Sequence, residues 1–313
     1  MPHRAAAPRA AYRNRCARAI APLALVAAAV LRAGAEPVPE SRCNLEAGPS
    51  QAVVRVLDAE TVAVDDGSEV RLIGALAPRA PGADTDPPSW PAEVDARKAL
   101  ETLVLGRTIE LAFAGRRSDR YGRRLAQVFV DRDGERVWVQ GYLLSHGHAR
   151  AYALAGNTAC LKELIAHEAV ARESGQGLWA SGAYKLRRAT RTRELLERRN
   201  SFEIVDGRVA LVAEKGKWVY LNFGADWRSD FSVAVPSRIK RSSPEAGAWL
   251  EALAGKRVRV RGWIERRNGP LIEVADLDQI EILPDDNSRD LGPGEAAATG
   301  GASRPFGPPA PRP

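Results

Sequence analysis

The chain has 313 residues, of which 45% are hydrophobic and 27% are charged, and its formal net charge is +7. This length suits roughly two domains of ordinary size, and the composition is typical of a folded soluble protein. It argues against a chain that is disordered throughout.

Residues 1–35 form a segment unlike the rest of the chain. They contain six arginines and no acidic residue, and an apolar run over residues 19–31 precedes a stretch of small residues at 33–35. This pattern predicts a secretory signal peptide, and the run is short for a membrane span. We expect an exported protein, periplasmic or secreted, without a membrane span after cleavage; an uncleaved N-terminal anchor is the alternative. Cleavage would lower the formal charge from +7 to +1, so the basic composition alone does not indicate a nucleic-acid partner.

Cleavage would also remove Cys16 and leave two cysteines, Cys43 and Cys160. An even pair in an oxidising compartment predicts a disulfide, which would tie the segment before the first strand to a helix near Cys160. Two buried thiols are the alternative reading.

Residues 51–180 are expected to form the first domain, after a lead segment at 36–50. Asp65, Asp66 and Gly67 form a hairpin turn signal, four prolines between 78 and 88 indicate an irregular loop, and Pro91 suits the start of a helix. Alternation and helical spacing predict five strands, at 52–57, 61–64, 69–73, 108–113 and 124–130, and three helices, at 92–105, 137–145 and 161–172.

Five strands with three helices predict a mainly β, α+β fold, an OB barrel with helices packed on it. Helices this sparse would not cover both faces of a parallel sheet, so a doubly wound α/β fold is disfavoured.

Residues 181–200 are rich in positive charge, with a net +5 between 181 and 199. We expect a basic helical linker here, either a solvated helix joining two domains or a surface that contacts phosphate groups. The candidate nucleic-acid-binding residues are Lys185, Arg187, Arg188, Arg191 and Arg193.

Residues 201–283 predict a second, smaller OB-like barrel. Strand patterns at 208–213, 218–223 and 231–235 precede a helix over 244–253, which Ser243 and Pro244 begin, and strands follow at 256–264 and 271–282. The tail at 284–313 is rich in Gly, Ala and Pro and is expected to be disordered. Two interpretations of Trp218, Trp227 and Trp263 stay open, as core residues or as platforms on which bases stack.

Three segments of the first domain carry a family resemblance: Asp58-Ala59-Glu60-Thr61, Val70-Arg71-Leu72-Ile73-Gly74, and Asp119-Arg120-Tyr121-Gly122-Arg123-Arg124-Leu125-Ala126. In this order and spacing they resemble the signature of the staphylococcal-nuclease (thermonuclease) family. The resemblance covers about residues 52–179 and includes the closing Gly177-Leu178-Trp179.

The resemblance implies a metal-dependent nuclease site. In the family two arginines hold the phosphate during attack, and Arg71 and Arg123 match them. Rigid guanidinium groups suit the charge that develops on the phosphate oxygens. Calcium sits among carboxylates, and the acidic turn that matches this chain's turn gives Asp58, Glu60 and Thr61 as its candidate metal residues. Asp119 and Tyr121 match the supporting residues of the arginine motif.

The chain departs from the family where the chemistry is done. After the first arginine the family has Asp-Thr-Pro-Glu, which supplies a metal ligand and the general base, whereas this chain has Leu76-Ala77-Pro78-Arg79. Losing a general base costs about 10²–10⁴ in rate, and a cation beside a divalent ion opposes its binding. Asp84 or Asp86 in the following loop could supply a carboxylate; a solvated loop is the alternative.

Each retained residue also has a structural interpretation. Arg71 could form an ion pair with Glu60 or be an exposed edge charge, and residues 119–122 could be only a turn with a packed tyrosine.

These observations predict an exported thermonuclease-like protein with a degenerate site, which binds single-stranded nucleic acid or another polyanion with weak or no hydrolysis. An active metal-dependent phosphodiesterase is the alternative. A protein or envelope glycan as the partner is a third, which no feature of the sequence selects.

Overall fold

The computed structural model of the protein describes residues 43–79, 90–182 and 184–284. The expected signal peptide, the carboxylates Asp84 and Asp86, and the expected disordered tail lie outside these residues. No helix within the described ranges is long and apolar enough to cross a membrane.

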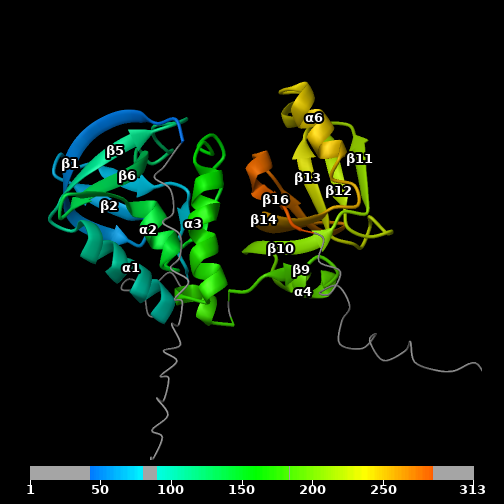
Figure 1. Cartoon of the computed structure of the whole chain (residues 1–313), viewed down its shortest axis with the longest axis horizontal. Helices are drawn as coiled ribbons and strands as arrows, with labels where there is room; N and C mark the ends of the chain where they lie inside the picture. Colours follow the sequence, from blue (N-terminus) through cyan, green and yellow to red (C-terminus); the bar gives the residue numbers. More distant parts are fainter. Residues whose placement is uncertain (1–42, 80–89, 183, 285–313) are drawn as a thin grey trace, which may run out of the picture. The chain divides into compact units, whose positions relative to one another are not determined.

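Five strands of the first domain form a closed barrel, as the sequence predicted. Its strand order is β1-β2-β3-β6-β5, and β5 returns to pair with β1. β3 and β6 are the parallel pair that closes it, and β7 extends the sheet beyond β6 (Figure 1). The strands are β1 Glu46–Asp58, β2 Thr61–Val64, β3 Glu69–Leu72, β5 Thr108–Phe113, β6 Arg124–Arg132 and β7 Glu135–Trp138.

Two boundaries differ from the prediction. β1 begins at Glu46, inside the expected lead segment, because Glu46 and Ala47 already pair with Phe113 and Ala112 of β5. The expected helix at 137–145 begins two residues late, because Val137 and Trp138 end β7 in register with β6.

Three helices cover the barrel: α1 Pro91–Val104, α2 Val139–Ser145 and α3 Leu161–Ser174. α1 packs against β1 and buries Ala96, Leu100, Leu103 and Val104, which share one helical face (Figure 1). The short strands β4 Ala75–Leu76 and β8 Arg150–Ala151 pair with each other, and the 3₁₀ helix η1 Gly177–Ala180 ends the domain.

Cys43 and Cys160 form a disulfide that spans 117 residues, with their Cα atoms 5.1 Å apart. It joins the chain just before β1 to the residue that precedes α3. A loop of this length restricts the unfolded chain strongly.

We expect the double variant Cys43→Ala/Cys160→Ala to lose about 2–5 kcal/mol of unfolding free energy, because the unfolded chain gains entropy when the loop is open. Urea unfolding of the mature protein measures this. The wild type treated with a reducing agent serves as a second route to the same loss. An unfolding midpoint that neither reduction nor the substitutions move would contradict the prediction.

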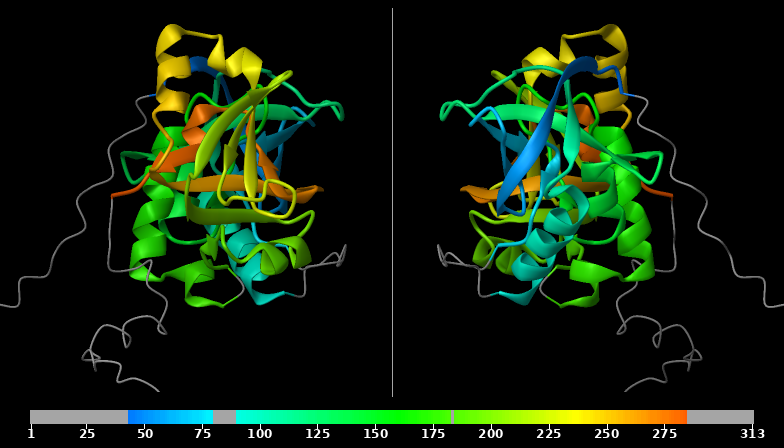
Figure 2. Two further views of the ribbon diagram at one scale, coloured as in Figure 1. Left: turned by 90° about the vertical axis from the view of Figure 1, so that its right-hand side faces the viewer. Right: turned by 90° about the vertical axis from the view of Figure 1, so that its left-hand side faces the viewer.

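The region after residue 184 contains an eight-stranded sheet, in the order β11-β12-β13-β15-β14-β10-β9, with β16 paired to β14. Helix α6 lies at one end of this sheet in both views of Figure 2. Its elements are β9 Arg187–Arg188, α4 Thr192–Glu197, β10 Phe202–Arg208, β11 Leu211–Lys215, β12 Trp218–Asn222, β13 Ser232–Pro236, α5 Ser237–Lys240, α6 Pro244–Glu251, β14 Arg257–Arg267, β15 Gly269–Glu273, η2 Leu277–Gln279 and β16 Ile280–Ile282.

The pairing order resembles that of the first domain. β13 and β15 are parallel, as β3 and β6 are, and only Val209 and Ala210 separate β10 from β11. β11 and β9 are the two ends of the paired path, so a second closed barrel stays a prediction. The strand expected at 271–282 is interrupted by η2, where Asp276 caps a 3₁₀ turn.

The expected basic helix at 181–200 is wrong. Only Thr192–Glu197 are helical, and Arg187 and Arg188 instead pair with Val205 and Asp206 of β10. A parallel pairing with a strand of the following sheet offsets the helical propensity of this segment.

A buried ion network links α3 to β14. Glu168 and Arg261 are both fully buried, and their side chains lie 3.0 Å apart. Glu168 also accepts hydrogen bonds from the Arg172 guanidinium at 2.6 Å and from the Ala151 N–H at 2.7 Å. Arg261 makes a second ion pair with Glu281 of β16, at 2.6 Å.

Candidate functional site

Glu60 and Arg71 form a buried ion pair at the start of the barrel's second hairpin. Thr61 and Arg71 are paired across β2 and β3, and Glu60 immediately precedes β2. Arg71 Nη2 lies 3.2 Å from Glu60 Oε2, and the Ala77 N–H donates to Glu60 Oε1 at 2.8 Å. The ion-pair interpretation of Arg71 is therefore confirmed, and both oxygens of this carboxylate already have partners.

Burial shifts the ionisation of Glu60. Removal from water raises the pKa of its carboxyl above the usual range, although Arg71, the Ala77 N–H and Arg79 act in the opposite direction. The charged form is therefore held by its cations and not by solvent.

The two positions where the family has carboxylates are occupied by an aliphatic side chain and a cation. Leu76 is half-buried at the end of β4 and offers no oxygen donor. Arg79 is exposed, and its Nη2 lies 3.6 Å from Asp58 Oδ2. Asp58 Oδ1 accepts the Glu60 N–H at 2.7 Å, so Asp58 is shared between a turn and an arginine.

These residues do not fit a calcium ion. Calcium takes six to eight oxygen ligands, several of them from carboxylates. Glu60 is engaged by a guanidinium and an amide, Asp58 by an amide and a guanidinium, and the Thr61 hydroxyl is a single buried oxygen with no hydrogen-bond partner. Within the described ranges no group of three or more His, Cys, Asp and Glu side chains is placed to hold a metal ion.

Asp119 organises the turn that carries the second arginine. Its Oδ1 accepts the N–H groups of Tyr121 at 2.9 Å and Arg123 at 3.1 Å, while Arg123 Nε donates to Oδ2 at 2.8 Å. Gly122 has a φ of 82°, a conformation that favours glycine and lets the turn close. Burial raises the pKa of Asp119, but the hydrogen bonds from Arg123 and the two amides outweigh it and hold the pKa below its usual range.

Tyr121 is 68% exposed, so the interpretation of a packed tyrosine is wrong for this turn. Its ring lies under two guanidinium groups, 4.7 Å from that of Arg120 and 5.4 Å from that of Arg123. An exposed ring beside arginines offers a surface on which a base can stack.

The two family arginines come from adjacent parallel strands. Arg71 of β3 is paired with Leu125 of β6, and Arg123 is two residues before Leu125. Both arginine side chains are partly exposed, and each has one carboxylate partner among the ion pairs of the described residues. The barrel therefore places two guanidinium groups at one edge, with part of each still open to a ligand.

The basic segment divides into buried and exposed residues. Arg187 is only 7% exposed and is held by Glu203 at 3.0 Å and Glu194 at 2.7 Å, so its expected role in binding nucleic acid is wrong. Lys185, Arg188, Arg191 and Arg193 are exposed.

Two of the three tryptophans of the second region are open to solvent. Trp227 is 46% exposed and Trp263 is 44% exposed, so the core interpretation is wrong for both. Trp218 is half-buried, with the Arg267 guanidinium 5.3 Å from its ring centroid.

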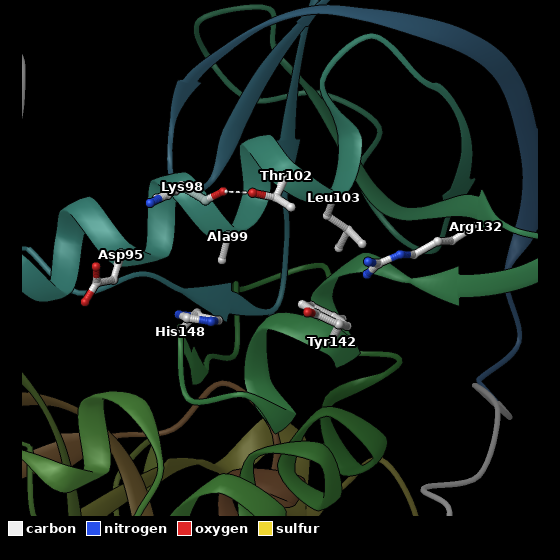
Figure 3. Close-up of a pocket in the computed structure, with 8 residues that line it drawn as sticks. All are labelled: Asp95, Lys98, Ala99, Thr102, Leu103, Arg132, Tyr142 and His148. Atoms are coloured by element: carbon white, nitrogen blue, oxygen red, sulfur yellow. Dashed lines mark hydrogen bonds between the residues drawn. The ribbon is translucent and has the colours of Figure 1, made fainter.

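A separate pocket of about 340 Å³ lies between α1 and the end of α2 (Figure 3). Asp95, Lys98 and Thr102 of α1 line it opposite Tyr142 and His148. Burial, with His146 nearby, lowers the pKa of His148, and Asp95 acts against this shift. The lining carries both signs of charge and includes none of the arginine-site residues.

Sequence reasoning missed Arg150 of β8, which lines another pocket and is buried. It stands in the alternating stretch 148–151, between Ala149 and Ala151, where the sequence gives no signal for an arginine with a special environment.

Comparison with known proteins agrees with this geometry. Residues 69–181 match the family described as staphylococcal nuclease homologue. The chain is 32% identical over 128 residues to proteins named "Uncharacterized endonuclease" in Escherichia coli O157:H7 and in Escherichia coli, covering 41% of this chain and 75% of each relative. It is also 32% identical over 135 residues to the SPbeta prophage-derived endonuclease YokF of Bacillus subtilis (strain 168), covering 42% of this chain and 44% of that protein. The chain therefore belongs to the staphylococcal nuclease homologue family.

Proposed function

We propose that this protein is an exported member of the nuclease family that binds single-stranded nucleic acid or a similar polyanion, with weak or no hydrolysis. The observation that carries the proposal is the contrast within one site. Arg71 and Arg123 are present and partly open, whereas Leu76 and Arg79 stand where the family's carboxylates would be.

Binding is favoured by the charges at this edge of the barrel. Guanidinium groups match phosphate oxygens in geometry and in charge. Arg79 adds a third cation near Asp58, and the exposed Tyr121 ring offers a stacking surface beside Arg123. A ligand that brings both phosphate groups and flat bases suits this combination.

Hydrolysis is disfavoured by the same residues. Arg79 cannot accept a proton from water, and loss of a general base costs about 10²–10⁴ in rate. The carboxylate oxygens of Glu60 and one of Asp58 are already used inside the protein. We therefore propose that binding does not require Ca²⁺.

An active metal-dependent phosphodiesterase is the second candidate. The arginine pair and the relatives named as endonucleases favour it. In that case Arg71 and Arg123 would stabilise the charge that develops on the phosphate, and Asp58 and Glu60 would be the available carboxylates.

Export rests on residues 1–35 and is supported by the Cys43–Cys160 disulfide, since such bonds persist in oxidising compartments. N-terminal sequencing of the protein recovered from the periplasm or medium of a bacterial host tests this. A chain that begins near Glu36 is expected, and intact protein confined to the cytoplasm would refute export.

The binding proposal is tested by titrating the mature protein with a single-stranded oligonucleotide over a series of salt concentrations. Because each neutralised phosphate contributes about −0.7 to the slope of log affinity against log salt, Arg71→Ala/Arg123→Ala should make that slope shallower by about 1.4. Arg71→Lys/Arg123→Lys should keep the slope but lose about tenfold in affinity, because lysine lacks the bidentate fork.

The lysine pair keeps a cation beside Glu60, so it separates loss of binding from loss of folding. Arg136→Ala, which removes an exposed arginine of β7 paired with Glu110, is the matched control. Binding that ignores salt, or that both arginine pairs leave unchanged, would exclude this site. Cleavage above the level of the alanine pair with Ca²⁺, Mg²⁺ or Mn²⁺ would establish the second candidate instead.

A further inference from the structure

A pocket of about 470 Å³ lies apart from the Arg71–Arg123 pair and joins residues of the nuclease domain to residues of the second region. Its volume falls in the range of about 300–1,000 Å³ that is usual for small-molecule sites. Cations and aromatic rings dominate the lining: Arg79, Arg150, Arg198 and Arg199, with Trp90, Tyr184, Phe202 and Trp263.

Arg150 is the unusual member of this lining. It is only 9% exposed, its Nη1 donates to the Phe202 carbonyl, and its Nε has no hydrogen-bond partner. Among the ion pairs of the described residues none includes Arg150, whereas the buried Arg187 and Arg261 each contact two carboxylates. A buried cation without a carboxylate is costly, and it marks a place where an anion is favoured.

The nearest acids are already committed elsewhere. Glu203 and Glu168 influence Arg150 from a distance, while burial holds the pKa of its guanidinium below the usual range. Glu203 accepts from Arg187 and Arg198, and Glu168 accepts from Arg172 and Arg261. Neither carboxylate is available to compensate Arg150.

The rim of the pocket adds positive charge. Arg199 is exposed and takes part in none of the ion pairs printed for the described part of the chain, and Arg79 contacts Asp58 only at 3.6 Å. Glu197 is the single carboxylate among the described lining residues, and it is paired with Arg193 at 3.3 Å.

Aromatic rings continue from the guanidinium to the surface. The Arg150 guanidinium lies 4.5 Å from the Tyr184 ring and 5.1 Å from the Phe202 ring. Trp263 packs edge-on against Phe202 with 5.9 Å between ring centroids, and 44% of Trp263 is exposed. A flat ring of a ligand could therefore stack on Trp263 while an attached anion reaches the arginines.

We infer that this pocket is a nucleotide-binding site, in which the phosphate pairs with Arg150 and the base stacks on Trp263. The inference does not rest on the proposed role of Arg71 and Arg123. It assigns to the second region a direct part in holding the ligand.

Titration of the mature protein with deoxyadenosine monophosphate, followed by calorimetry, tests the inference. One site is expected, and Arg150→Met should weaken the nucleotide at least tenfold. Without ligand, Arg150→Met should unfold at the same temperature as the wild type or higher, since it removes an uncompensated buried charge. A purely structural arginine would instead give a lower unfolding temperature with unchanged affinity.

Two further arms identify the ligand. Trp263→Ala should weaken deoxyadenosine monophosphate but leave inorganic phosphate unaffected, and the same titrations in the Arg71→Lys/Arg123→Lys background should give the same affinities. Inorganic phosphate that binds as tightly as the nucleotide would overturn the nucleotide assignment. Affinity that is lost only with the Arg71 and Arg123 substitutions would place the nucleotide in the other site and refute this one.

Discussion

The double variant Leu76→Asp/Arg79→Glu is expected to cleave single-stranded DNA with Ca²⁺ at least about 100-fold faster than the wild type, because it supplies a general base and a metal carboxylate. It also removes the cation that lies 3.6 Å from Asp58. The barrel itself needs no change, since Leu76 is already half-buried at the end of β4 and Arg79 is exposed.

The matched control is Leu76→Asn/Arg79→Gln, which has similar shape and no added negative charge. It should stay as slow as the wild type, and adding Arg123→Ala to the acidic variant should abolish the gain, since the phosphate would lose its second guanidinium. Hydrolysis of a labelled oligonucleotide over a calcium series measures these rates. A folded acidic variant that is no faster than its amide control would show that the lost carboxylates are not what limits the reaction.

Glu168→Gln is expected to lower the free energy of unfolding by about 3–5 kcal/mol, because it leaves the fully buried Arg261 with one carboxylate fewer and also deprives Arg172 of its partner. The substitution preserves the shape of the side chain, so the loss reports charge and not packing. Urea unfolding monitored by tryptophan fluorescence measures it.

Glu110→Gln is the control, because it breaks the exposed Arg136–Glu110 pair of 2.9 Å and should cost no more than about 1 kcal/mol. Equal effects of the two substitutions would mean that burial does not set the value of the Glu168 network. Retained oligonucleotide binding by Glu168→Gln below its unfolding transition would show that the network acts on stability alone.

Local patterns predicted most of the barrel because its strands are short and its turns carry strong signals. Asp65, Asp66 and Gly67 do form the turn between β2 and β3, and the apolar alternation of each strand faces the core. The boundary of β1 was missed because its first residues pair with a strand about 60 positions later, which no local pattern reports.

The site was only partly readable for the same reason. The Arg71–Glu60 pair follows from adjacent strands and could be foreseen, whereas Arg187 lies in a charge run that looks solvated. Its burial depends on Glu203, sixteen residues away, and the isolation of Arg150 depends on which acids other arginines have taken. Such competition for partners becomes visible only when the whole arrangement is known.

The buried contact between Glu168 and Arg261 bears on where this protein can be cut. A fragment that keeps only the family-matched residues 69–181 would lack β1, β2 and Cys43, and it would leave Glu168 without the guanidinium from β14. Even a fragment of residues 43–181 would expose the surface that Arg261 now seals. We therefore regard the nuclease barrel as dependent on its C-terminal neighbour for autonomous folding, so that a truncated preparation would report on a damaged molecule.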